Sequence, residues 1–207
     1  MNKFDTNGWG EFKIGDIFDI QTGSLLNSKE LKNGDIKRIS AKNENNGIIG
    51  SYDTEFIKEA RHYENFISVN FFGDTFYHPY KASVEMKVHI LKLKNKVFTQ
   101  SSGIFIASIL KRYFSDKFGY GNQLSSSKLK NENFKISLPI TQNGEIDFEF
   151  METTIKNTKS KMQNILNTYK SLIERERERV KFGIWILVQI TLYFRKNAVL
   201  FKVALCK

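Results

Sequence analysis

Short stretches in which apolar and polar residues alternate dominate the first 140 residues and predict strands, because side chains two apart line one face of a sheet. Asn46-Gly47 lies between two of these stretches and favours the positive φ angles of a tight reversal, so we expect a hairpin there. The final stretch precedes Pro139. The predicted strands lie at residues 17–20, 36–41, 48–52, 66–70, 88–93 and 136–138.

One amphipathic helix is predicted within this region. Ser101-Ser102 offers an N-cap, and Ile106, Leu110 and Phe114 follow at helical spacing. We expect the helix to end near Phe114, before the breaking sequence Gly119-Tyr120-Gly121.

After Gly144 the spacing of apolar positions changes to alternating steps of three and four, without Pro or Gly. This heptad pattern predicts a long helix that forms a coiled coil, and its narrow seam favours one partner helix. An amphipathic helix that packs on its own domain is the alternative. We therefore expect an α+β fold: a mixed globular domain over residues 1–147 and a coiled-coil-forming helix over 148–180. The seam positions are Phe148, Met151, Ile155, Thr158, Met162, Ile165, Tyr169 and Leu172.

The segment 181–207 differs in character from the rest of the chain. It follows a strict Glu-Arg repeat at 174–179, and residues 182–194 are almost entirely apolar. That run is shorter than the roughly 17–25 residues of a membrane span, so we expect no membrane association. A repeated GA dinucleotide would encode Glu-Arg alternation and is prone to slippage, and our hypothesis is that residues after Arg179 are an out-of-frame extension.

The formal net charge of +10 favours an anionic partner such as nucleic acid. The charge is uneven, with a net +7 over residues 74–135 and +8 over residues 151–207. The single cysteine, Cys206, and a polar N-terminus predict a cytoplasmic protein.

Motifs for chemistry are nearly absent. The chain has no GxxxxGK[ST], GxSxG or HExxH motif, and its three histidines lack metal-ligand spacing, so we expect no metal site. The one catalytic pattern is Asp74 followed by Glu85 and Lys87, which could hold Mg²⁺ in a small nuclease. Glu-x-Lys occurs often by chance, and we expect a protein without catalytic activity.

Two polar loops are the candidate DNA-binding elements, one leading into the predicted hairpin and one following residue 119. Asn and Gln can bond adenine edges, Arg and Lys suit guanine, and Ser with Lys suits phosphate. Solvated loops rich in turn-forming residues are the alternative. The candidate DNA contacts are Lys37, Arg38, Ser40, Lys42, Asn43, Asn45, Asn46, Tyr80, Lys81, Tyr120, Asn122, Gln123, Ser126 and Lys128.

A series of short motifs around these loops resembles the DNA specificity subunits of type I restriction–modification systems and those of type IIB systems. The series opens with Trp-Gly-Glu-Phe-Lys-Ile-Gly-Asp-Ile-Phe at 9–18, and the similarity covers about residues 9–173. The other matching segments are Gly23, 39–40, 46–52, 65–69, 76–77, 80–83, 120–125, 136–139, 144–148, 151–152 and Ile155.

The resemblance implies a target recognition domain followed by a conserved helix. Members usually carry two such units with antiparallel helices, whereas this chain has one and looks like a half subunit. It would bind double-stranded DNA, pair with a second copy or another half subunit, and direct a methyltransferase subunit and possibly a restriction subunit to a bipartite site. Those partners use S-adenosylmethionine, and possibly ATP and Mg, while this chain is expected to bind no cofactor. A membrane-tethered or inactive truncated specificity subunit is a further alternative, suggested by the apolar tail.

Overall fold

The computed structural model describes residues 6–27, 31–131 and 134–205, with the side chains of the last helix described through residue 193. The chain divides into two compact units, residues 1–156 and residues 157–207. We call the first the globular unit and the part of the last helix from Asn157 onward the distal helix, and describe each by itself.

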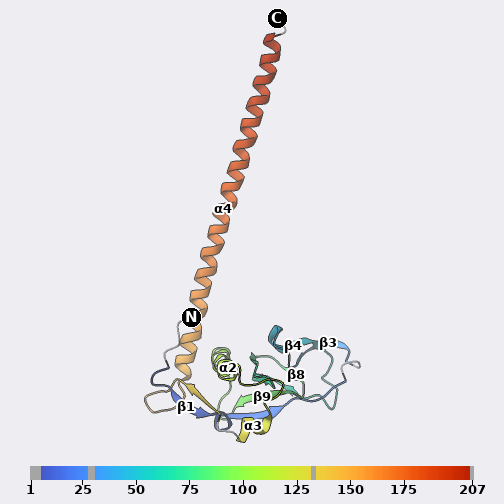
Figure 1. The fold of residues 1–207 in the computed structure, drawn as a ribbon, viewed down its shortest axis with the longest axis vertical. Helices are drawn as coiled ribbons and strands as arrows, with labels where there is room; N and C mark the ends of the chain where they lie inside the picture. The colour runs from blue at the N-terminus through green and yellow to red at the C-terminus, as the bar shows by residue number, and fades with distance from the viewer. Residues whose placement is uncertain (1–5, 28–30, 132–133, 206–207) are drawn as a thin grey trace. The chain divides into compact units, whose positions relative to one another are not determined.

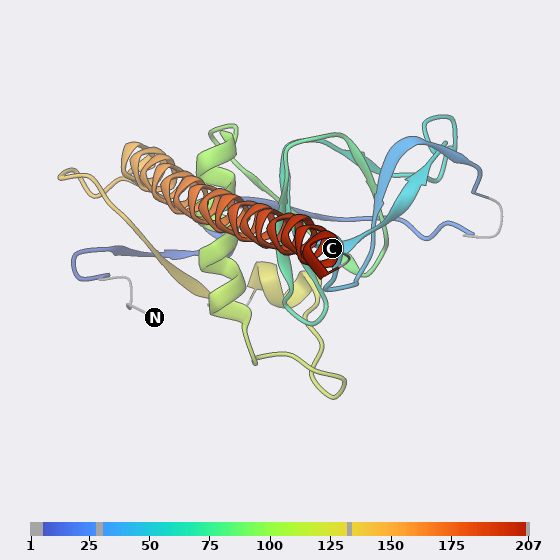
Figure 2. The same cartoon turned by 90° about the horizontal axis from the view of Figure 1, so that it is seen from above.

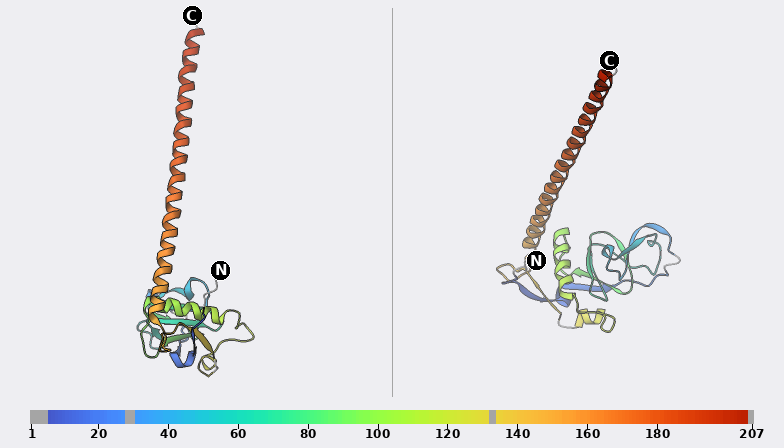
Figure 3. Two further views of the ribbon diagram at one scale, coloured as in Figure 1. Left: turned by 90° about the vertical axis from the view of Figure 1, so that its left-hand side faces the viewer. Right: turned by 45° about the horizontal axis from the view of Figure 1, so that its top comes forward.

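The described residues of the globular unit form three small sheets and several helices. A two-stranded sheet pairs β1 with β10, and two four-stranded sheets have the orders β2-β9-β6-β7 and β4-β3-β8-β5. The β1–β10 pair and the β3–β4 hairpin lie at opposite ends of the unit (Figure 1 and Figure 3). The elements are β1 (Gly10–Lys13), α1 (Ile14–Ile17), β2 (Phe18–Thr22), β3 (Asn33–Ile39), the 3-10 turn η2 (Asn45–Gly47), β4 (Ile48–Tyr52), β5 (His62–Tyr63), β6 (Phe66–Asn70), β7 (Thr75–His78), β8 (Ala82–Val84), β9 (Val88–Leu93), α2 (Gln100–Phe114), α3 (Ser126–Asn131), β10 (Lys135–Leu138) and α4 (Phe148–Leu205).

The predicted hairpin is present, since β3 and β4 pair antiparallel. Its connection is an eight-residue loop, 40–47, instead of a two-residue turn. Asn45, Asn46 and Gly47 have φ angles of 46°, 53° and 77°. Asn and Gly tolerate this left-handed region best, which explains why the reversal occurs at this sequence.

Helix α2, light green in Figure 2, packs against β6, β7 and β10. Its N-cap is Thr99, two residues before the predicted Ser101-Ser102, and Thr99 forms a capping box with Ser102. Gly103 lets α2 lie close to β7, because a Cβ at this position would lie only 2.4 Å from the Tyr77 ring. The larger hydrophobic core combines Ile106 and other α2 residues with residues of the β2-β9-β6-β7 sheet.

Helix α4 begins at Phe148 and continues unbroken to Leu205 (Figure 1). Met151 is fully buried in the larger core, and Ile155 packs against the same core. The first turns of the predicted seam therefore pack on their own domain, and these two residues are not free to face a partner helix. The α+β fold with a long C-terminal helix is confirmed, and the expected boundary at residue 180 coincides with no break in the helix. No described helix is long and apolar enough to cross a membrane.

Candidate nucleic-acid interface

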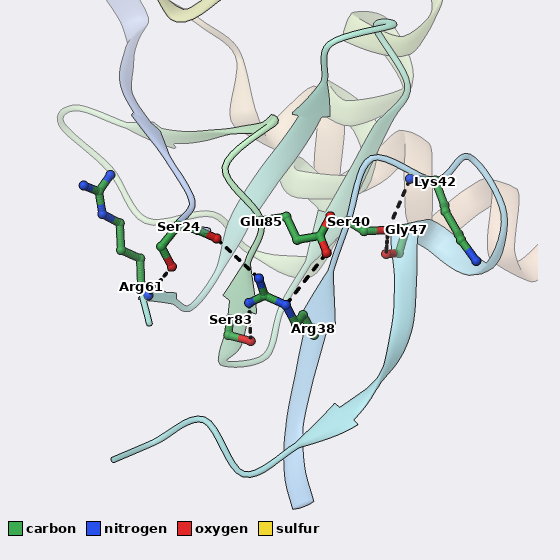
Figure 4. A network of polar contacts seen from close by, with 8 residues as sticks. All are labelled: Ser24, Arg38, Ser40, Lys42, Gly47, Arg61, Ser83 and Glu85. Carbon is green, nitrogen blue, oxygen red and sulfur yellow. Dashed lines mark hydrogen bonds and ion pairs between the residues drawn. The ribbon is translucent and has the colours of Figure 1, made fainter. Parts of the chain in front are cut away.

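Arg38 is part of the framework that holds β3 in place. Its side chain is 2% exposed and donates to Ser83 Oγ at 3.4 Å and to the Ser24 carbonyl at 3.3 Å, with Glu85 at 3.9 Å (Figure 4). Burial lowers the pKa of the guanidinium, and the charge of Glu85 opposes that shift. A side chain enclosed in this way cannot reach a base edge, so we remove Arg38 from the predicted DNA contacts.

Ser40 shapes loop 40–47 from inside. It is 7% exposed, donates to the Gly47 carbonyl at 3.3 Å and accepts from the Lys42 amide at 3.3 Å (Figure 4). Its hydroxyl is thus used within the loop, and we remove it from the predicted contacts as well. The four remaining candidates of this loop are all exposed: Lys42, Asn43, Asn45 and Asn46.

Lys37, on β3, contacts Tyr80, which lies between β7 and β8. The Lys37 ammonium is 3.8 Å from the centre of the Tyr80 ring, a cation–π contact, and the Tyr80 hydroxyl is 3.1 Å from His78 Nδ1. Burial raises the pKa of Tyr80. The neighbouring Lys81 forms an exposed ion pair with Glu55 at 2.6 Å, and the hydrogen bond from Lys81 lowers the pKa of Glu55.

The second predicted loop is anchored at its end and exposed at its tip. Ser126 Oγ lies 3.1 Å from Nδ1 of the buried His89, so this serine serves as an anchor. At the tip, Tyr120 is 90% exposed and Gln123 is exposed. Asn122 is bonded locally, since its Oδ1 accepts from Lys128 Nζ at 2.5 Å and its Nδ2 donates to the Lys117 carbonyl at 3.3 Å.

The turn between β6 and β7 joins the two loops. Asn70 Nδ2 donates to the Ala41 carbonyl of the first loop at 2.8 Å, and the Phe71 carbonyl accepts from the Leu124 amide of the second at 2.9 Å. Phe72 meets Tyr120 edge-on with ring centres 5.2 Å apart. The structure therefore brings the two predicted loops together around residues 70–74. We call the surface formed by loop 40–47, turn 70–74 and residues 119–128 the loop face.

Sequence reasoning missed turn 70–74 as part of this surface. The available signal was Phe71-Phe72-Gly73-Asp74 directly after an apolar strand. In the structure, Gly73 has a φ of 92°. Lys87, which directly precedes β9, adds a positive charge 5.2 Å from the Phe71 ring. Aromatic rings beside lysines and amides form a surface suited to nucleic acid.

The nuclease pattern is not assembled in the described residues. Asp74 accepts from Asn70 Nδ2 at 2.9 Å, Glu85 faces Arg38, and Lys87 lies over Phe71. Among residues 6–27, 31–131 and 134–205 there is no group of three His, Cys, Asp or Glu side chains that could hold a metal. Each carboxylate has a structural partner on a different element.

The remaining seam positions lie on the distal helix. Met162, Ile165, Tyr169 and Leu172 are 48–64% exposed, and Thr158 is exposed on the same helix. These residues remain candidates for a partner helix, unlike Met151 and Ile155.

Comparison with known proteins identifies the family. The model of the type I restriction modification DNA specificity domain matches residues 6–170. A specificity subunit of a type II restriction enzyme from Heyndrickxia coagulans, S.BcgI, is 33% identical over 159 residues, which are 74% of this chain and 44% of that protein.

Two solved structures share the fold. The S subunit of a type I restriction–modification system from M. genitalium has a TM-score of 0.55 at 20% identity, covering 86% of this chain and 45% of its own. The HsdS subunit from Thermoanaerobacter tengcongensis has a TM-score of 0.52 at 12% identity, covering 80% and 40%. This chain thus spans less than half the length of these relatives, and it belongs to the family of type I restriction–modification DNA specificity domains.

Proposed function

We propose that this chain is the DNA-recognition subunit of a restriction–modification system and has no catalytic activity of its own. The observation that carries the proposal is the convergence of two amide-rich, lysine-bearing loops on turn 70–74, within a domain of the specificity family. Exposed amides can bond base edges, and the surrounding lysines can bind phosphates.

We assign different tasks to residues of the loop face and to Lys87 beside it. Lys42 and Lys87 bind the DNA backbone, which fixes register without selecting sequence. Asn43 and Gln123 are the leading base-contact candidates, because their side chains are exposed. Asn45 is exposed as well, and its Nδ2 also donates to the Ile48 carbonyl at 3.4 Å. Tyr120 and Phe72 supply an apolar contact surface between the two loops.

The partners follow from this role. We propose that a methyltransferase subunit, which uses S-adenosylmethionine, modifies adenine at the site that this chain selects, and that a restriction subunit joins the same complex in the cytoplasm. Pairing of two such chains would supply the two halves of a bipartite site.

The test is single-molecule mapping of adenine methylation in cells that carry the partner methyltransferase gene with or without this chain. A methylated bipartite sequence that is present only with this chain is the expected result. A methylation pattern unchanged by its presence would contradict the recognition role. Cleavage of DNA by the purified chain with Mg²⁺ alone would instead support the nuclease, and the matched variant Glu85→Gln would show whether the activity is its own.

A further inference from the structure

The two loops of the loop face are attached to different sheets. Loop 40–47 closes the β3–β4 hairpin of the β4-β3-β8-β5 sheet, whereas turn 70–74 connects β6 with β7 in the β2-β9-β6-β7 sheet. The base pairs of one DNA site lie at fixed distances from each other. Side chains on two loops can therefore read one site together only if the loops keep a fixed relative position. A contact that ties the two sheets at this face thus bears directly on specificity.

Asn70, the last residue of β6, provides such a contact. It is 3% exposed, and its side-chain amide uses both hydrogens and both oxygen lone pairs. Oδ1 accepts from the amides of Phe72 at 2.9 Å and Asp74 at 3.0 Å, and these bonds shape turn 70–74. Nδ2 donates to Asp74 Oδ2 at 2.9 Å and to the Ala41 carbonyl at 2.8 Å. One buried side chain thus forms the turn of one sheet and holds the loop of the other.

The bond to Ala41 acts on the whole of loop 40–47. Ser40, the neighbour of Ala41, closes the base of the loop, because its amide donates to the Gly47 carbonyl at 2.8 Å and its hydroxyl donates to the same carbonyl (Figure 4). A loop closed at its base moves as a unit, so a bond beside this closure sets where the exposed amides of the loop lie. Asn43, the leading base-contact candidate of this loop, is two residues from Ala41.

The second loop is held by different bonds. The Leu124 amide donates to the Phe71 carbonyl at 2.9 Å, and the Leu124 carbonyl lies 3.3 Å from Nε2 of His89 on β9. The Leu124 side chain is itself buried in the larger core. Its neighbour Gln123 is therefore positioned through Leu124, and the side-chain bond from Asn70 to Ala41 takes no part in this anchoring.

We propose that Asn70 is a positioning residue for DNA recognition, which fixes loop 40–47 against the rest of the loop face without touching DNA itself. The role rests on the proposed recognition function and adds to it the residue that sets how the two loops read one site. The residue type fits the task. Asparagine offers a donor toward Ala41 and an acceptor toward the turn amides from one short side chain, whereas aspartate offers the acceptor alone.

The sharpest test exchanges two residues of the turn, in the double variant Asn70→Asp with Asp74→Asn. The carboxylate at position 70 still accepts from the two turn amides, and the amide at position 74 donates to it, so the turn and the net charge are kept. Of the bonds described for Asn70, the one to Ala41 is lost. Asn65→Asp is the matched control, because Asn65 directly precedes β6 at its other end and its Nδ2 donates to the Phe98 carbonyl, also at 2.8 Å.

Hydrogen–deuterium exchange of the free full chain tests the positioning itself. In the double variant, the amides of loop 40–47 should exchange at least about tenfold faster than in the unchanged chain, because the loop loses a buried anchor. The Leu124 amide should keep its rate. Asp74→Asn alone should leave both loops unchanged, since it keeps the bond from Asn70 to Ala41. Equal exchange of residues 40–47 in the double variant and the unchanged chain would overturn the proposal.

A second variant covers the case in which the double variant does not fold. Asn70→Ser keeps a hydroxyl that can accept from a turn amide, but its side chain is too short to reach Ala41 as well. The same faster exchange of loop 40–47 is expected. Protection lost throughout the globular unit in both variants would show that Asn70 serves the fold alone, and the positioning role would be wrong.

Selection from a library of randomised DNA duplexes, by the full chain with its partner methyltransferase, tests the effect on reading. Asn43→Ala and Gln123→Ala first identify the base positions that each loop selects. The double variant should lose about tenfold of selectivity at the positions assigned to Asn43 and keep those assigned to Gln123. Its median affinity over the library should stay within about threefold, because phosphate contacts are kept. Asn65→Asp should keep both sets of positions.

The outcomes separate the positioning role from the recognition function. A double variant that selects the same sequence as the unchanged chain would refute the role of Asn70 while DNA recognition stands. A uniform loss at all base positions would also refute it, because the effect would not pass through loop 40–47. An unchanged chain that selects no sequence, or a selected sequence that neither Asn43→Ala nor Gln123→Ala alters, would contradict base reading by the loop face, and the role of Asn70 would fall with it.

Discussion

Two buried histidines, His78 on β7 and His89 on β9, form hydrogen bonds that link the strands of the globular unit to neighbouring loops. His78 lies between Ser68 Oγ at 2.8 Å and the Tyr80 hydroxyl at 3.1 Å, and His89 lies between the Leu124 carbonyl and Ser126. Burial lowers the pKa of both, and that of His78 falls to about 4. Each histidine is therefore neutral at pH 7 and uses both ring nitrogens for structure.

The first prediction concerns pH and His78. Its pKa is lower in the folded state than the ordinary 6.5, so between pH 6.5 and pH 4 the unfolded chain binds a proton that the folded chain does not. Stability should therefore fall as the pH falls through this window, by about 2 kcal/mol between pH 7 and pH 5 from this group. Urea unfolding at the two pH values measures it. His78→Gln is less stable at pH 7 but should lose less on acidification, and an equal loss in both proteins would contradict the assignment.

The second prediction compares the buried Arg38, which supports the fold, with the exposed Lys42 of the adjacent loop. Removing the Arg38 side chain leaves Ser83, Glu85 and the Ser24 carbonyl without their partner, so Arg38→Ala should cost about 2–4 kcal/mol of unfolding free energy. Lys42→Ala removes an exposed charge from the adjacent loop and should change stability by less than about 0.5 kcal/mol. Chemical denaturation of the two variants compares them. A stable Arg38→Ala protein with reduced DNA affinity would return Arg38 to the interface.

The third prediction concerns the tip of the second loop. Gln123→Ala should cost roughly 1–3 kcal/mol of discrimination at one base pair, because it removes an exposed amide. Lys128→Ala should weaken binding to all sequences alike and flatten the salt dependence. Competition binding at several salt concentrations with the cognate site and single-base variants distinguishes the two effects. Unchanged sequence preference in Gln123→Ala would remove this amide from base readout.

At the scale of elements, the contact between α2 and β7 depends on Gly103. An alanine Cβ at this position would lie 2.4 Å from the Tyr77 ring, so helix or ring must move. We expect Gly103→Ala to lower stability by about 1–3 kcal/mol, which is the usual cost of overpacking. Gly119→Ala is the matched control, since a Cβ there meets nothing within 4 Å. Equal thermal unfolding of the two variants would contradict this packing.

Elements whose residues alone determine them were predicted from the sequence, whereas elements that depend on distant parts of the chain were missed. β6 and the β3–β4 hairpin were predicted because the alternation and Asn46-Gly47 are local signals. β7 and β8 were missed because each is only three or four residues long and is fixed by its neighbours in the sheet. Arg38 was wrongly predicted to contact DNA for a related reason. A basic residue next to a polar loop is expected to be exposed, and only the folded structure shows that Arg38 is buried against Ser83 and Glu85. The burial of Met151 likewise depends on tertiary packing that the heptad pattern alone does not contain.

At the scale of the whole molecule, pairing should impose its symmetry on the DNA target. Two identical recognition domains related by a two-fold axis select the same half-site on opposite strands, so the methylated sequence should be an interrupted palindrome. Methylation mapping of cells that carry this chain together with the partner methyltransferase gene measures this. A non-palindromic site would show that a single copy works with a different half subunit.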